Sequence, residues 1–141
     1  METGLIGLIV AGAGLVLAGA GVRLATRAVD REAGQRAVSV PLIVAVAGQM
    51  LSLLALLSTL ILQAPPPAGH AYAAILWVLF GYAVFHSAVA LVGLVFVLLR
   101  HRYGFISARR SGPPRIARLW SDYASVVTLI ALAVGQIAAV V

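Results

Sequence analysis

Four long apolar runs place the strongest constraint on what this chain can fold into. They cover about residues 4–22, 38–62, 71–99 and 119–141. A helix needs about 20 apolar residues to cross the hydrocarbon core of a bilayer, and each run has roughly that length or more. Because 62% of the residues are hydrophobic and only 10% are charged, no part of the chain is left for a water-soluble domain. We therefore predict an all-α integral membrane protein, residues 1–141 being one transmembrane domain folded as an antiparallel four-helix bundle.

The basic residues predict how the chain is oriented. All are arginines, and they fall in only two segments, one between the first two runs and one between the last two: Arg23, Arg27, Arg31 and Arg36, then Arg100, Arg102, Arg109, Arg110, Arg115 and Arg118. Arginine-rich loops stay in the cytoplasm, so both termini and the Pro65-Pro66-Pro67 turn should lie outside. Short basic loops between apolar runs also argue against nucleic acid as a partner and leave membrane lipid as the surroundings.

Small side chains recur on one face of three runs. They alternate three and four residues apart, at Gly7, Ala11, Gly14, Ala18 and Gly21, at Ala45, Gly48, Ser52, Ala55 and Thr59, and at Ala124, Thr128, Ala131, Gly135 and Ala138. Helices in lipid associate through close contact of such residues. We therefore predict helix packing along these faces, including Gly7, Gly14, Gly48 and Gly135. The faces either hold the bundle together alone or also dock onto another subunit.

Groups that could carry chemistry are scarce. The chain has no cysteine, which excludes disulfides, thiolate metal sites and iron–sulfur clusters. No carboxylate lies in the middle of a run, which disfavours proton-coupled drug export. Only His86 is a histidine deep in a run, too few for a two-haem bundle. We therefore predict no catalytic residue, no metal site and no cofactor in this chain.

Three polar residues within or beside the runs require an explanation. We interpret His86 as a neutral imidazole bonded to a backbone carbonyl or to a hydroxyl on a neighbouring helix, with a proton relay or a ligand role as the alternative. Gln49 is expected to bond between helices. Asp122 follows Arg118 and Trp120, so we place it at the start of the fourth helix, where its carboxylate favours the positive end of the helix dipole or pairs with an arginine of the preceding loop.

The third run and the start of the fourth have a distinctive order of residues. A tyrosine-led aromatic stretch is followed by His86 and Gly93, and after a basic loop come Trp120 and Asp122. This order resembles the last two helices of subunit III of haem-copper cytochrome c oxidases, whose penultimate helix carries a His-Gly-X-His motif and a later glycine. His86 matches the first histidine and Gly93 the glycine, whereas Val89 stands at the second histidine.

The resemblance covers about half of the chain well. The first two runs match by position only, and the first three of the seven family helices have no counterpart in this sequence. The resemblance implies an accessory, non-redox subunit of a respiratory terminal oxidase in the bacterial inner membrane. Catalytic subunits I and II would be its partners and would hold the haem and copper, while this chain would stabilise that core and its proton-uptake side.

Two other functions remain open on the sequence. One is a small transporter or channel subunit that assembles with itself through the small-residue faces. The other is a structural subunit of an unrelated membrane complex, in which His86 only packs the bundle.

Overall fold

A computed structural model describes residues 2–62, 64, 66–69 and 71–138, without the side chains of residues 2–5 and 136–138. It contains four α-helices, α1 (Glu2–Asp30), α2 (Gln35–Leu62), α3 (Ala71–Arg102) and α4 (Gly112–Ala138), and a short 3-10 helix, η1 (Ala108–Arg110). Each α-helix is long and apolar enough to cross a membrane. No strand occurs in this part of the chain, and the predicted all-α four-helix membrane bundle is confirmed.

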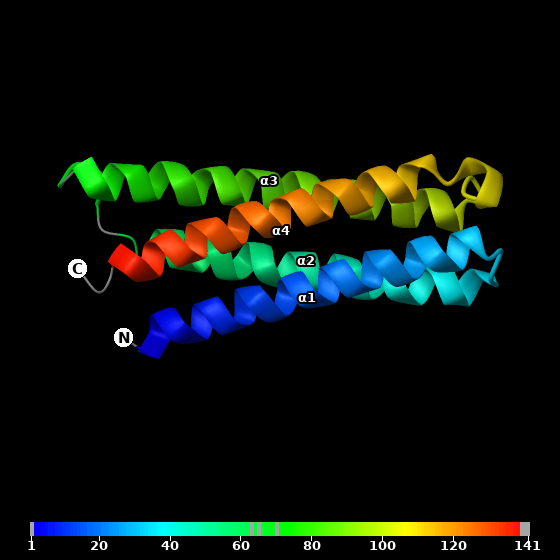
Figure 1. Ribbon diagram of the computed structural model, residues 1–141, viewed down its shortest axis with the longest axis horizontal. Coiled ribbons are helices and arrows are strands. Elements are labelled where there is room, and N and C mark those ends of the chain that lie inside the picture. The colour runs from blue at the N-terminus through cyan, green and yellow to red at the C-terminus, as the bar shows by residue number, and fades with distance from the viewer. Residues whose placement is uncertain (1, 63, 65, 70, 139–141) are drawn as a thin grey trace.

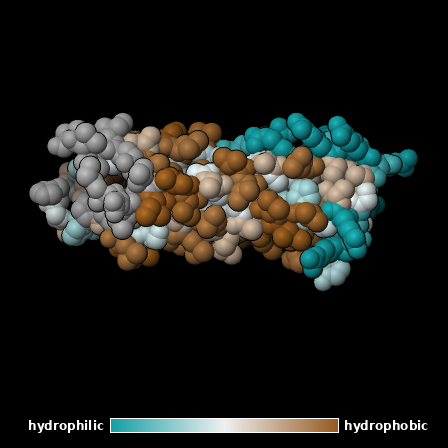
Figure 2. Space-filling model, turned by 90° about the horizontal axis from the view of Figure 1, so that it is seen from below, coloured by the Kyte–Doolittle hydropathy of each residue, from teal (hydrophilic) through white to brown (hydrophobic). Residues whose placement is uncertain are grey.

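The helices form a ring in which each one contacts two neighbours. The pairs are α1 with α2, α2 with α3, α3 with α4, and α4 with α1. Both termini and the α2–α3 connection lie at one end of the elongated bundle, and the two arginine-rich connections lie at the other (Figure 1). Hydrophobic surface covers the middle of the molecule, while hydrophilic residues gather at the arginine-rich end and extend further along one side (Figure 2).

Two helices extend well beyond the predicted spans at the arginine-rich end. α1 continues through Arg23 and Arg27, which we expected in a loop, and α4 begins at Gly112 instead of near residue 119. Pro113 and Pro114 occupy the first turn of α4, where a missing N–H removes no helical hydrogen bond. The last three residues of the predicted fourth span, 139–141, lie outside the described residues.

The closest helix contact joins α1 to α2 through glycine. A Cβ atom placed on Gly14 would lie 2.6 Å from the carbonyl oxygen of Gly48, and one on Gly48 would lie 2.6 Å from the carbonyl oxygen of Gly14. Gly21 approaches Pro41 in the same way. Backbones this close leave no room for side chains, so glycine is required at these points. The remaining small residues of the same faces from Ala11 to Gly21 and from Ala45 to Ala55 are also buried.

The core consists of two apolar clusters separated by a polar layer. One cluster includes Leu56, Phe80 and Leu132 toward the end that holds the termini, and the other includes Leu42 and Leu94 toward the arginine-rich end. Between them along α2 and α3 lie four fully buried residues with polar or small side chains: Gln49, Ser52, Ser87 and Ala90. The bundle therefore has a hydrogen-bonding layer near its middle.

Candidate functional site

Two of the residues that carry the family resemblance, His86 and Trp120, meet on the outside of α3 and α4. The His86 ring stacks on the ring of Trp120 with centroids 6.2 Å apart, and it meets the edge of Tyr123 at 5.2 Å. Tyr82, one turn before His86, lies 4.0 Å from the imidazole and shares a 2.6 Å hydroxyl–hydroxyl hydrogen bond with Tyr123. We call Tyr82, Phe85, His86, Trp120 and Tyr123 the outer aromatic cluster.

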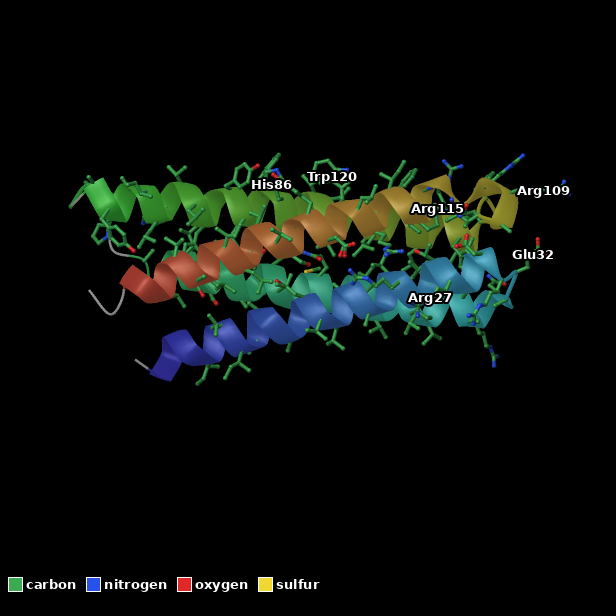
Figure 3. All side chains as sticks on the ribbon, in the orientation of Figure 1. Arg27, Glu32, His86, Arg109, Arg115 and Trp120 are labelled. Carbon is green, nitrogen blue, oxygen red and sulfur yellow. The ribbon has the colours of Figure 1, made fainter. Side chains whose placement is uncertain are left out.

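Helix geometry explains how this cluster forms. Tyr82 and His86 are four residues apart and Trp120 and Tyr123 three apart, so each pair shares one face of its helix. His86 and Trp120 both lie on the side of α3 and α4 that faces away from α1 and α2 (Figure 3). The sequence prediction singled out His86 and Trp120 but missed Tyr82, although its i, i+4 spacing from His86 was a readable signal.

The imidazole of His86 is fixed by its own helix. Its Nδ1 atom lies 2.8 Å from the backbone carbonyl oxygen of Tyr82. A carbonyl oxygen only accepts hydrogen bonds, so in the neutral ring Nδ1 carries the hydrogen and Nε2 presents a lone pair. The expected carbonyl partner is therefore present, on the same helix. No described residue donates a hydrogen bond to Nε2.

The prediction that Asp122 begins the fourth helix is wrong. α4 starts at Gly112, so Asp122 lies in its third turn, beyond the reach of the N-terminal helix dipole. Its carboxylate instead accepts a 2.7 Å hydrogen bond from the guanidinium group of Arg23 on α1, and Nε of Arg118 lies 3.9 Å away. The main partner is a residue that we had placed in the other arginine-rich segment, so charge pairing, not the dipole, explains the carboxylate.

A second ion pair joins the same two helices. Arg115 of α4 lies 3.2 Å from Asp30 of α1. Asp30 follows Arg23 by seven residues and Arg115 precedes Asp122 by seven, so the two pairs lie about two turns apart on antiparallel helices. In one pair the arginine comes from α1, and in the other it comes from α4. Both of these ion pairs join the first helix to the last, and the third ion pair among the described residues, Arg118–Asp122, lies within α4.

The polar layer holds the predicted interhelical bond of Gln49. Its Nε2 atom donates to the hydroxyl of Ser87 on α3 at 2.6 Å. The other amide atom, Oε1, and the hydroxyls of Ser52 and Thr128 are buried without a hydrogen-bond partner in the described part of the chain. Such groups are costly in a membrane interior, which makes this layer a second place to look for function.

The other predicted residues occupy simpler positions. A Cβ atom on Gly93 would meet nothing within 4 Å, so this glycine is not required by any described neighbour. A Cβ atom on Gly135 would lie 3.1 Å from the ring of Phe80, which joins α4 to α3. Gly7 is half-buried on α1. No three histidine, aspartate or glutamate side chains of the described residues gather as a metal site.

No protein-family model and no curated protein sequence matches this chain. The function must therefore be argued from the bundle, the outer aromatic cluster and the resemblance of the third and fourth spans.

Proposed function

We propose that this multi-pass membrane protein is an accessory, non-redox subunit of a haem-copper terminal oxidase in a bacterial inner membrane. The chain would stabilise catalytic subunits I and II, which would hold the haem and copper, and would support their proton-uptake side. It would bind no redox centre itself.

One observation carries this proposal. His86 and Trp120, which lie on different helices and supply most of the resemblance to subunit III, stack on one another at a single level of the bundle. They face away from α1 and α2, where a neighbouring subunit could reach them. Polar and aromatic groups directed out of a bundle suit contact with a partner, whereas a cofactor site in a bundle is built from inward-facing residues.

The experiment that tests the proposal is purification of the tagged full chain from its native membranes in mild detergent. We expect a haem-bearing partner to co-purify in a constant ratio, with a reduced-minus-oxidised haem spectrum and oxygen consumption in the same fraction. After the partner is removed, the chain itself should show no Soret band. Recovery of the chain without any haem protein, from membranes that contain assembled oxidase, would refute the proposal.

A transporter or channel subunit is the second candidate, and the polar layer favours it. The unpartnered oxygens of Gln49, Ser52 and Thr128 are the kind of groups that line a path for water or a small polar solute. Reconstitution of the chain alone into sealed liposomes distinguishes the two candidates. An oxidase subunit should leave the liposomes as tight as protein-free ones, and a channel should release a trapped ion or small solute.

A further inference from the structure

The outward face of α3 has unsatisfied hydrogen-bonding capacity. Hydrogen-bonding groups within a membrane normally turn into the bundle, as Gln49 and Ser87 do here. His86 does the opposite: its Nε2 lone pair lacks a donor among the described residues, and the hydroxyls of Tyr82 and Tyr123 are paired on the exposed surface. Lipid tails offer no hydrogen-bond donor. This surface therefore suits a protein neighbour better than acyl chains.

The apolar face of α3 also extends further toward the arginine-rich end of the bundle than the apolar part of α4 does. Leu94 and Val97 of α3 pack in one cluster with Ala117 of α4, and Ala117 lies between Arg115 and Arg118. At this level α4 already carries charge. On α3, however, Phe96 and Leu99 remain 51% and 49% exposed. A bilayer that ends at the level of Ala117 would leave these apolar side chains among headgroups or water, and their exposure there is unfavourable in proportion to the apolar area.

We propose that the outward face of α3 is the docking surface for a transmembrane helix of a larger, different membrane subunit. This α3 docking face consists of Val78, Tyr82, Phe85, Val92, Phe96 and Leu99, which are exposed. Their steps of four, three, seven, four and three residues keep them on one face of the helix, with the half-buried Val89 between Phe85 and Val92. The proposal rests on the proposed function, because it names the surface through which an accessory subunit binds its partner. The partner helix supplies a hydrogen-bond donor to Nε2 of His86.

Charge selects a different subunit over a second copy of this chain. The end of α3 and the connection after it carry Arg100, Arg102, Arg109 and Arg110. Arg100 also lies over the rings of Phe96 and Phe105 at 5.5 and 5.6 Å. Two copies with the same orientation in the membrane, joined by their α3 faces, would bring these basic ends together. A partner with acidic residues at this level would be attracted instead.

The test places a photo-crosslinking amino acid at Val92 of the full chain in its native membrane. Val16 on α1 is the matched control, because the two valines are 68% and 70% exposed on long apolar helices. We expect Val92 to form a dominant adduct whose crosslinked peptide, identified by mass spectrometry, belongs to a transmembrane segment of one larger subunit. Val16 should not form this adduct. An adduct of Val92 with a second copy, adducts with lipid alone, or equal yields from both positions would overturn the proposal.

A pair of bulky variants tests the same face without a crosslinker. Val92→Trp should reduce retention of the crosslinked partner in detergent by at least fivefold, and Val16→Trp should leave it unchanged, while both variants still insert and fold. Equal retention would overturn the proposal. The nature of the partner separates this inference from the proposed function. A partner without haem that crosslinks to Val92 would support the α3 docking face and refute the proposed oxidase function. An oxidase that binds this chain through another face would support the proposed function and refute the docking face.

Discussion

The two ring nitrogens of His86 have different surroundings. Nδ1 is held by the carbonyl oxygen of Tyr82, so the ring orientation is set within α3 and does not depend on a neighbouring helix. Nε2 is directed to the outside, where its function depends on what covers the outer aromatic cluster. We therefore expect substitution of His86 to affect contacts on the outside of the bundle more than folding of the bundle.

Two substitutions of His86 separate a hydrogen-bonding role from a proton relay. His86→Gln keeps polarity and approximate size, so we expect normal assembly with the partner and normal oxygen consumption. His86→Leu should weaken assembly by about 0.6–2 kcal/mol, or roughly 3- to 30-fold, because one interhelical hydrogen bond is lost. Assembly is measured by co-purification and turnover by oxygen consumption. A fully assembled but slow His86→Gln complex would instead support a proton relay, since glutamine does not titrate.

The two ion pairs between α1 and α4 should differ in their contribution to stability. The Arg23–Asp122 pair lies about 10 Å further from the end of α1 than Asp30 does, at the level of the outer aromatic cluster. Its side chains are 44% and 36% exposed, against 62% and 43% for the Arg115–Asp30 pair. We expect Asp122→Asn to lower the free energy of unfolding in detergent by about 1–3 kcal/mol, because Arg23 loses its partner. Asp30→Asn, the matched control at the helix end, should cost less than about 1 kcal/mol.

A second substitution provides an internal check on this interpretation. If the cost of Asp122→Asn comes from an unpaired guanidinium group, then Arg23→Gln combined with Asp122→Asn should recover part of the lost stability. Strict additivity of the two single substitutions would show that the 2.7 Å contact contributes no coupling.

At the scale of the helix, the sequence predicted which small residues lie in helix–helix contacts, but not how each helix is rotated about its own axis. The small-residue faces of the first, second and fourth runs were readable because close approach in lipid permits only small side chains, and most of these residues are indeed buried. The direction of His86 was not readable. α3 is apolar on nearly every side, so periodicity does not show which face turns inward. The Arg23–Asp122 pair likewise depends on how α1 and α4 are rotated, which no local pattern encodes.

The glycine contact between α1 and α2 gives a sharp test at this scale. Gly14→Ala would place a Cβ atom 2.6 Å from the carbonyl oxygen of Gly48. Because that oxygen belongs to the backbone of α2, the two helices would have to move apart. We expect a loss of about 1–3 kcal/mol in the free energy of unfolding in detergent. Gly12→Ala is the matched control on the same helix, because a Cβ atom there meets nothing within 4 Å. Equal effects of the two substitutions would contradict the seam.

At the scale of the whole molecule, hydropathy predicted the membrane spans but not the ends of the helices. The apolar run of the first helix stops at Val22, yet α1 continues to Asp30, because an arginine-rich segment is still a good helix former. Hydropathy reports where lipid ends, and backbone hydrogen bonding decides where a helix ends. The pairing of Asp122 and Asp30 with arginines stabilises these extensions and makes the arginine-rich end of the bundle an ordered structure rather than loose loops.

The arrangement of the ends leads to a prediction about orientation. Gly34 and Ser107 lie at the arginine-rich end and Gly69 at the opposite end, and all three are exposed. The chain has no cysteine, so one introduced at each position is the only thiol. Since arginine-rich loops remain in the cytoplasm, a membrane-impermeant maleimide added to intact cells should label Gly69→Cys alone. Gly34→Cys and Ser107→Cys should react only after the inner membrane is opened. Labelling of Gly34→Cys in intact cells would show that the topology is inverted. The arginine-rich end of α3, and any acidic partner residues attracted to it, would then lie outside the cell.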